Sequence, residues 1–419
     1  MMNQYGAEGM TVSEARAVAI GGCLETAPGC FMPLHFNGKT HYIPAGASQT
    51  TSVGVHFVSN PKMINMVLFN GVDPRTGIQV LPPHNRELKT YEDFWDQYKK
   101  YYAKTLEPTV KAGNIQHDIW RDRNMSIVNS LFKPDCLKNG HHIGHMGTRY
   151  NATYNIESCG TINMVNSLAA LKKLVYEDKK YTLDDFRDAI KDNFGFYTAV
   201  ESKAFSLGEQ IKKPDVTKYD EIHGDCLKAP KHGNDEDYVK EILKEYEDWF
   251  CDLCNTYESL YAKPMYACQI SVALHAAVGM ATFATPDGRL CNTAFADGSM
   301  SAYPGTDRKG PYALLSSGCC WDQSKSQNSQ INMKFHPNAV RGLDGSKKLL
   351  TMISAFMNKG GFHVQFNIVD SKMLKEAQIH PESNRDLLVR VSGFTQYWVE
   401  TGKPVQDEVI ARTEFEGGI

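Results

Sequence analysis

Helix-like and strand-like segments alternate through the C-terminal part of the chain. A helical pattern over 346–358 ends at Gly360-Gly361, the alternating sequence FHVQFNIV follows at 362–369, and a short helix is predicted at 371–378. Glycine commonly ends a helix, and alternation of apolar and polar residues is typical of a half-buried strand. This order indicates an α/β protein with a largely parallel sheet.

The upstream sequence continues the alternation. We expect a strand at 51–58 and helices at 85–112, 161–177, 182–193 and 236–260. The fourth of these segments opens with Thr182 followed by Asp185, which is close to a capping box.

The longest apolar stretch, ISVALHAAVGMATFA, occupies 270–284. It is too short to span a bilayer and contains His275, so it predicts a buried core helix.

Charge and cysteine usage exclude several classes of protein. The net charge is -3 with acids and bases interspersed, which argues against a nucleic-acid or anionic-membrane partner. The N-terminus has neither the basic nor the apolar region of a signal peptide. Eleven irregularly spaced cysteines argue for reduced thiols. We therefore expect a cytoplasmic protein. The sequence has no nucleotide-binding glycine pattern, so we expect no cofactor bound in this chain.

The stretch GGCLETAPGC at 21–30 places a cysteine in a glycine-rich loop. In an extended loop residues i and i+2 point the same way, so Cys23 and Glu25 can face one substrate. A negative neighbour raises a thiol pKa, so this pair suits hydrogen-atom transfer beside a proton donor or acceptor better than ionic attack. The alternative is a buried structural cysteine in a tight turn.

A second unusual stretch, LVRVSGFTQYW at 388–398, sets Gly393 in a β-prone, apolar neighbourhood. Glycine weakens a strand and usually marks a bulge, a turn or a close backbone approach. It is also the residue whose Cα can flatten and share an unpaired electron with the flanking amide groups, because it has no Cβ.

The combination of GCxE, GGFHVQFNIVD at 360–370 and RVSGFTQYW resembles the glycyl radical enzymes over essentially the whole chain. The resemblance implies that Gly393 stores a radical, takes hydrogen from Cys23 and leaves a thiyl radical to attack the substrate. It implies a pyruvate formate-lyase-like ten-stranded α/β barrel, of which this chain is the C-terminal half-barrel with surrounding helices. We expect the catalytic domain with the cysteine loop at 1–290 and the glycine radical domain at 291–419.

The loop GGCLETAPGCFMPL is most similar to the 4-hydroxyphenylacetate decarboxylases within that family. By this resemblance His56 and Glu157 hold the phenol group of the substrate, Glu157 acts as a base, and Glu25 relays a proton. From the residues alone, His56 is better explained as a satisfied core histidine, and Glu157, just ahead of a predicted helix, can serve the helix dipole. The reaction implied is conversion of 4-hydroxyphenylacetate to p-cresol and CO2.

Alternatives within the family are an indoleacetate or phenylacetate decarboxylase and a diol or hydroxyproline dehydratase. The resemblance also implies a separate activase that uses S-adenosylmethionine and a 4Fe-4S cluster, a small iron-sulfur subunit and an oligomeric enzyme. Family members carry a first half-barrel before the cysteine loop. This chain alone is therefore expected to be inactive without that N-terminal half, and a non-catalytic fragment remains an alternative.

Two further motifs favour no metal. The histidines of GHHIGHMG at 140–147 lack the acidic partner of HExxH, and Cys251-x-x-Cys254 lies in a helical stretch without a second CxxC.

Overall fold

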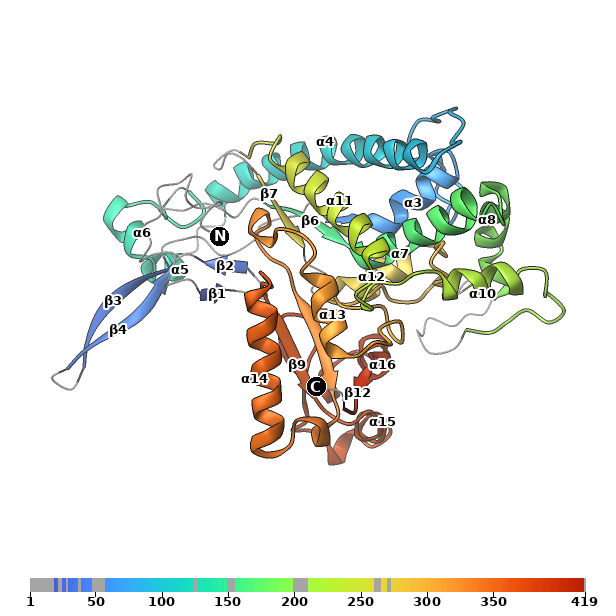
Figure 1. The fold of residues 1–419 in the computed structure, drawn as a ribbon. Helices are drawn as coiled ribbons and strands as arrows, with labels where there is room; N and C mark the ends of the chain where they lie inside the picture. Colours follow the sequence, from blue (N-terminus) through green and yellow to red (C-terminus); the bar gives the residue numbers. More distant parts are fainter. Residues whose placement is uncertain are drawn as a thin grey trace.

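The fold was analysed in a computed structural model of the 419-residue chain. The described residues are 19–21, 25–27, 29–36, 39–46, 57–123, 127–145, 147–148, 155–198, 210–259, 265–269 and 273–417. In Figure 1 the elements β9, α14, α15 and α16 make up the lower part of the molecule, and α3, α4, α7 and α11 the upper part.

The strands are short and spread along the whole described chain. Their bounds are β1 Ala19–Gly21, β2 Glu25–Ala27, β3 Gly29–Phe36, β4 Lys39–Gly46, β5 Phe57–Ser59, β6 Asn155–Cys159, β7 Tyr266–Gln269, β8 Ile331–Phe335, β9 Val364–Ile368, β10 Leu388–Arg390, β11 Thr395–Tyr397 and β12 Glu414–Phe415.

The helices separate these strands. Their bounds are α3 Asn60–Leu68, α4 Tyr91–Arg123, α5 Ile127–Leu131, α6 Pro134–Asn139, α7 Thr161–Leu171, α8 Leu183–Lys191, α10 Asp220–Lys228, α11 Asp237–Cys254, α12 Leu274–Ala281, α13 Pro311–Gly318, α14 Gly342–Asn358, α15 Ser371–Ile379 and α16 Lys403–Ala411.

Two three-stranded parallel sheets form the centre of the fold. One has the order β5-β6-β7 and the other β12-β8-β9. A parallel bridge between Ala267 in β7 and Ser326, ahead of β8, connects the two sheets. The remaining described strands form the antiparallel hairpins β1-β2, β3-β4 and β10-β11. The predicted α/β fold with a largely parallel sheet is confirmed.

Several predicted helices and one predicted strand are confirmed, and short-range sequence signals explain them. Thr182 and Asp185 form the capping box that begins α8. The pattern over 161–177 forms α7, which continues without a break as a π-helical turn over Lys172–Glu177. The alternating sequence after Gly360 forms β9, as predicted.

Three predicted helices have different extents. The helix expected at 85–112 is α4, which begins at Tyr91 and continues to Arg123. The helix expected at 236–260 ends at Cys254. The stretch 270–284 was expected to be a buried core helix. In its described part, 273–284, the helix is the eight-residue α12, and Ala277 in the centre of α12 is exposed. His275 and Ala276 are buried, so one face of α12 is in the core and the other lines a surface cavity of about 560 Å³. The expectation of full burial was wrong because small alanine and glycine side chains tolerate either environment.

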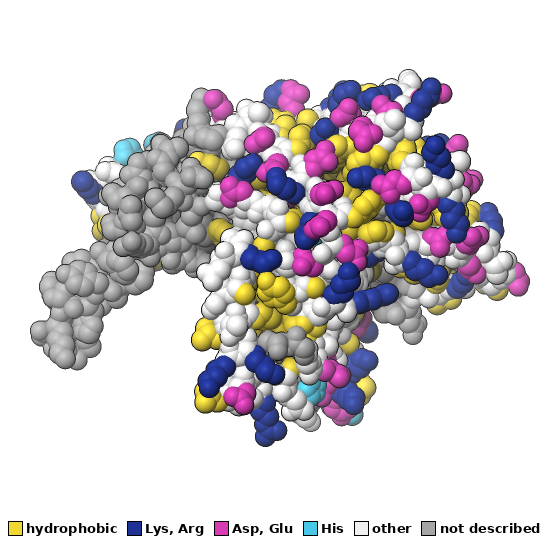
Figure 2. All heavy atoms as spheres, viewed as in Figure 1, with side chains coloured by type: hydrophobic (Ala, Val, Ile, Leu, Met, Phe, Trp, Pro, Cys, Tyr) yellow, Lys and Arg dark blue, Asp and Glu magenta, His cyan; other side chains and the backbone are white. Residues whose placement is uncertain are grey.

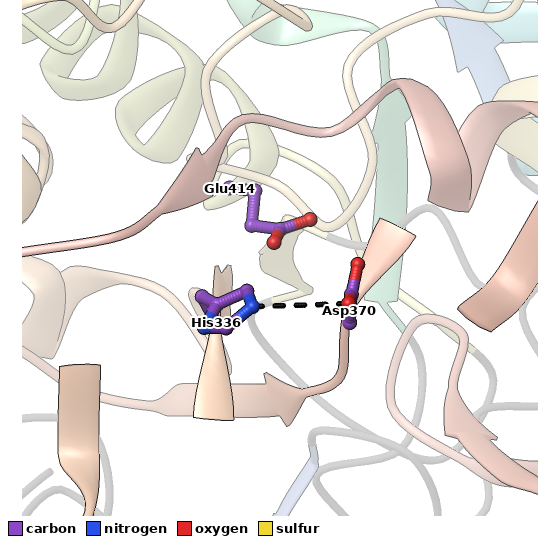
Figure 3. Close-up of side chains that lie close together, drawn as sticks. All are labelled: His336, Asp370 and Glu414. Carbon is purple, nitrogen blue, oxygen red and sulfur yellow. Dashed lines mark ion pairs between the residues drawn. The ribbon is translucent and has the colours of Figure 1, made fainter. Parts of the chain in front are cut away.

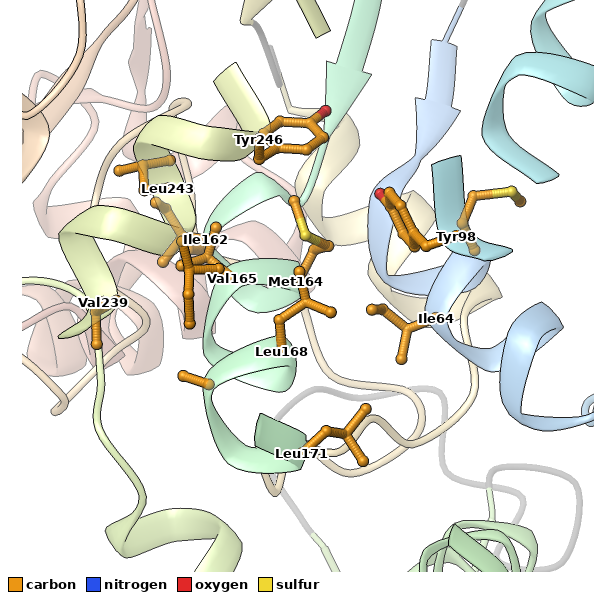
Figure 4. Packing of buried hydrophobic residues seen from close by; sticks show 14 of the residues in the cluster. Ile64, Tyr98, Ile162, Met164, Val165, Leu168, Leu171, Val239, Leu243 and Tyr246 are labelled. Carbon is orange, nitrogen blue, oxygen red and sulfur yellow. The ribbon is translucent and has the colours of Figure 1, made fainter. Parts of the chain in front are cut away.

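The larger hydrophobic core surrounds helix α7, all of whose side chains are buried. Figure 4 shows Ile162 and Val165 beside Val239 and Leu243 of α11, with Ile64 of α3 near Met164. α3 and α11 pack against this helix. Its buried Asn163 and Asn166 accept from the backbone N–H groups of Ala296 and His232 in neighbouring loops.

A smaller core lies beneath the β10-β11 hairpin. It consists of Val369, Leu374, Ala377, Val389, Val391, Trp398 and Val409. These side chains come from the end of β9, from α15 and α16 and from the hairpin itself. The hairpin therefore packs on a hydrophobic core that is separate from the larger one.

The visible face mixes acidic and basic side chains (Figure 2), in keeping with the net charge of -3. None of the described helices combines the length and the apolarity needed to cross a bilayer.

We predict that Leu374→Ala destabilises the hairpin unit more than the rest of the chain. Leu374 is fully buried in the smaller core, and truncating such a leucine costs about 2–5 kcal/mol. Hydrogen exchange should accelerate in β10, α15 and α16 and stay unchanged in α7. The exposed Leu350→Ala is the matched control and should leave both regions unchanged. Equal acceleration of exchange in α7 would show that the smaller core is not independent of the larger one.

Candidate functional site

Gly393 lies in the turn between β10 and β11. The hairpin pairs Arg390 with Thr395, and the Val391 N–H donates to the Phe394 carbonyl at 2.9 Å. Gly393 is buried and has a φ of 85°, in the left-handed region that favours glycine. Of the options that the sequence left open for this glycine, a turn is the one observed.

Side chains of β9 hold this turn. The Gly393 N–H donates to Gln365 Oε1 at 3.1 Å, and Arg390 Nε donates to the same oxygen at 2.8 Å. Asn367 accepts from the Arg390 N–H at 2.8 Å and donates to the Arg390 carbonyl at 2.7 Å. The glycine turn is thus attached to β9 through amide side chains.

A buried ionic network holds the other side of the turn. Arg412 Nη2 donates to the Val391 carbonyl at 2.7 Å. The same guanidinium binds both oxygens of Glu408, at 2.9 and 2.8 Å, and its Nη1 lies 3.2 Å from Asp297 Oδ2. Glu408 Oε2 is in turn 3.0 Å from Nε2 of His275 in α12. This network, defined as His275, Glu408, Arg412 and Asp297, connects α12 to the glycine turn.

The network keeps its charges because they compensate one another. Burial alone raises the pKa of Glu408, but the Arg412 guanidinium and His275 outweigh burial and hold that pKa below its usual value. Burial also acts to lower the pKa of Arg412, and the two carboxylates raise it. For Asp297 burial prevails and raises the pKa in spite of Arg412. Arg412 and Glu408 therefore form the ionised centre of the network.

Glu157 is part of β6 and does not precede a helix directly, since α7 begins only at Thr161. Its neighbour Ser158 bonds Gln269 Oε1, and Gln269 Nε2 donates to Glu247 of α11 at 2.6 Å. Ser158 therefore lies on the face of the sheet that is turned toward α11. Because strand side chains alternate, Glu157 lies on the opposite face, where it is 2% exposed.

Asn155 shares that face with Glu157 and was not predicted from the sequence. It is fully buried, and neither its Nδ2 nor its Oδ1 has a hydrogen-bond partner among the residues that the structure describes. A buried amide without partners costs free energy unless a ligand or water pairs with it. A lone asparagine in a strand carries no sequence signal of this kind, so only the structure could identify it.

Three of the expected site residues cannot be placed by their side chains. Cys23 and His56 lie outside the described residues. The backbone of Glu25 is in β2, paired with Gly21. Of the predicted set, the structure places Glu157 on the face of the first sheet opposite Ser158 and Gly393 in the turn beside the second sheet.

His336, Asp370 and Glu414 come together at the end of β8 (Figure 3), with candidate ligand atoms within 4.8 Å of one another. Backbone N–H groups already bind one atom of each: Asn338 to His336 Nδ1, Lys372 to Asp370 Oδ1 and Ser371 to Glu414 Oε2. The buried ammonium of Lys334 lies 4.0 Å from Glu414. Helix caps and a lysine thus account for this cluster without a metal ion.

The two motifs weighed as metal sites have other contacts. His142 Nε2 lies 3.0 Å from the Arg121 carbonyl, and its Nδ1 accepts from the Gly144 N–H at 3.1 Å. Cys251 and Cys254 are buried in α11, and burial raises the pKa of both thiols.

Comparison with known families decides the relationship. The chain matches the pyruvate formate lyase-like family over residues 1–279 and the glycine radical family over residues 296–399. The chain belongs to the glycyl radical enzymes. Gly393 falls within the second match, and the fold is that of the α/β barrel of this family.

The relatives extend across the whole chain. It is 56% identical over 417 residues to the 4-hydroxyphenylacetate decarboxylase glycyl radical subunit of Clostridioides difficile strain CD196, covering 100% of this chain and 46% of that protein. It is 42% identical to the indoleacetate decarboxylase of Tractidigestivibacter scatoligenes, covering 98% and 45%. The chain thus spans about half the length of these curated relatives.

A solved structure from another organism has a similar fold. The structure of a Roseburia inulinivorans protein described for 1,2-propanediol dehydration superposes with a TM-score of 0.83 at 29% identity, covering 99% of this chain and 48% of that one.

We predict that Arg412→Gln lowers the free energy of unfolding by about 3–5 kcal/mol, because it leaves buried carboxylates without their cation. Denaturant unfolding measures the loss. Lys403→Gln is the control in α16, the helix that Arg412 follows, since Lys403 pairs with Asp407 but is 61% exposed. It should change stability little. Equal effects of the two substitutions would show that the network contributes nothing beyond a surface pair.

Proposed function

We propose that this chain is the radical-bearing, C-terminal half of a glycyl radical decarboxylase that converts 4-hydroxyphenylacetate to p-cresol and CO2. The observation that carries the proposal is the buried, left-handed Gly393 turn in a chain 56% identical throughout to the glycyl radical subunit of such an enzyme. Glu157, the base expected for this substrate, is buried on the face of the first sheet opposite Ser158.

In the proposed reaction Gly393 takes a hydrogen atom from Cys23 and leaves a thiyl radical. The thiyl radical removes one electron from the substrate carboxylate and becomes a thiolate, while Glu157 accepts the phenolic proton. Loss of CO2 leaves a benzylic radical whose spin spreads over the ring. Glu25 protonates the thiolate, the thiol returns a hydrogen atom to the benzylic carbon, and Glu157 returns the phenolic proton. The net change is uptake of one proton and release of CO2.

One-electron chemistry suits this substrate because ionic loss of CO2 would place a carbanion beside an electron-rich ring. In this scheme Glu157 accepts a proton and Glu25 donates one. His56 is assigned to the phenol group on the family resemblance alone.

Other parts of the proposal rest on the family. The complete enzyme requires an N-terminal half, an activase that uses S-adenosylmethionine and a 4Fe-4S cluster, and a small iron-sulfur subunit in an oligomer. The division into a catalytic part at 1–290 and a glycine radical domain at 291–419 stays a prediction, as does a cytoplasmic location.

An indoleacetate decarboxylase is the second candidate, favoured by the 42% identical relative. The test is a substrate panel on the chain combined with an N-terminal half and activated anaerobically. We expect p-cresol from 4-hydroxyphenylacetate and little skatole from indoleacetate. Skatole as the main product would support the second candidate, and turnover of diols alone would refute an arylacetate decarboxylase.

We predict that Glu157→Gln lowers turnover about 100-fold or more without lowering the radical signal, since a glutamine cannot accept the phenolic proton. Product analysis and electron paramagnetic resonance (EPR) on the same sample measure the two quantities. Full turnover with a normal signal would remove the base assignment.

Asn155→Ala should raise KM about tenfold or more while kcat changes less, because the unpartnered amide is available to bind a polar group of the substrate. Steady-state kinetics on the activated assembly measure both constants. An unchanged KM would show that Asn155 does not contact the substrate.

A further inference from the structure

Gln365 has an unusual position relative to the glycine turn. It is 5% exposed, is the second residue of β9, and is 28 residues away from Gly393 in sequence. Its Oε1 accepts from both the Gly393 N–H and Arg390 Nε. We infer that Gln365 is a positioning residue for Gly393, which fixes the orientation of the peptide on which the proposed radical resides.

The orientation of the Gln365 amide is itself fixed. Its Nε2 lies 3.1 Å from His363 Nε2, so the amide donates to the imidazole and its oxygen is directed at Gly393. Burial, together with the nearby Arg390 guanidinium, lowers the pKa of His363 to about 4. The imidazole is therefore neutral at pH 7 and can accept this hydrogen bond. The reverse orientation would lose the two hydrogen bonds that the Gln365 oxygen accepts from Gly393 and Arg390.

Arg390 closes the arrangement from the hairpin side. Its Nε shares the Gln365 oxygen with Gly393, and its Nη1 donates to Thr395 Oγ1 at 3.0 Å. Asn367 binds both backbone groups of Arg390. The residues before and after Gly393 are thus held by the same face of β9, and Gln365 contacts Gly393 itself.

The arrangement has a chemical consequence for a glycine radical, so the inference rests in part on the proposed function. An electron at Cα is shared with the amide nitrogen and the carbonyl only when these groups lie in one plane. An acceptor fixed on the N–H determines the orientation of that plane. A neutral amide oxygen also carries no hydrogen atom that a radical could abstract, so it can accept from the N–H without quenching a nearby radical.

The first test uses the unactivated chain and does not depend on the radical. Labelling serine carbonyls with carbon-13 and glycine amides with nitrogen-15 selects the Ser-Gly pairs, which occur at 317–318 and 392–393. One signal then reports Gly393 and the other reports Gly318 in α13 as an internal reference for folding.

Gln365→Met keeps the length of the side chain and removes its acceptor, whereas Gln365→Glu keeps an acceptor. Gln406→Met is the matched control, because Gln406 is a buried glutamine in α16 that donates to the Trp398 carbonyl at 2.8 Å and does not contact Gly393.

We expect hydrogen exchange at Gly393 to accelerate about tenfold or more in Gln365→Met, and much less in Gln365→Glu and Gln406→Met, with Gly318 unchanged in all three. Unchanged exchange at Gly393 in Gln365→Met, or equal acceleration in Gln406→Met, would overturn the inference. Acceleration at both Gly393 and Gly318 would show general unfolding and would also count against a positioning role.

The second test measures EPR of the activated assembly with nitrogen-15 glycine. We expect Gln365→Met to lower the radical yield or change the nitrogen hyperfine coupling, and Gln406→Met to leave both unchanged. An identical spectrum and yield in Gln365→Met would overturn the role in radical positioning. Absence of any signal in the unsubstituted assembly would instead refute the proposed function, and the exchange result would stand independently.

Discussion

The contact between Arg412 and the Val391 carbonyl is the constraint on which the glycine turn depends. A guanidinium buried this deeply is stable only with carboxylates beside it, and Glu408 and Asp297 supply them. Through Glu408 the network reaches His275 in α12. The turn that carries Gly393 is therefore attached to the main body of the protein by charge, while β9 attaches it by neutral amides and the small core supports it from below.

Local sequence signals predicted much of the fold. The capping residues of α8, the helical pattern that forms α7 and the alternation in β9 each depend on neighbours within a few positions, and all three were found as predicted. α12 was not, because a stretch rich in alanine and glycine does not specify which side is buried. Motifs in the chain were enough to indicate the family, which the comparisons confirm.

The residues that support the candidate site could not be predicted in the same way. Gln365 contacts Gly393 across 28 residues, and Arg412 contacts Val391 across 21, so no short pattern links them. Asn155 differs from any other buried asparagine only in having no partner among the described residues. Glu157 was expected near the substrate from resemblance, but its place within β6 depends on pairing with β5 and β7. Such tertiary relations become visible only in the folded chain.

The most direct test of the account is the EPR spectrum of the assembly activated anaerobically, prepared with ordinary glycine, with glycine deuterated at Cα and with Gly393→Ala. The account predicts a doublet from the single remaining α-hydrogen, its collapse on deuteration and its absence in the alanine variant. A doublet that persists in Gly393→Ala, or a folded assembly without any signal, would contradict the assignment of the radical to Gly393.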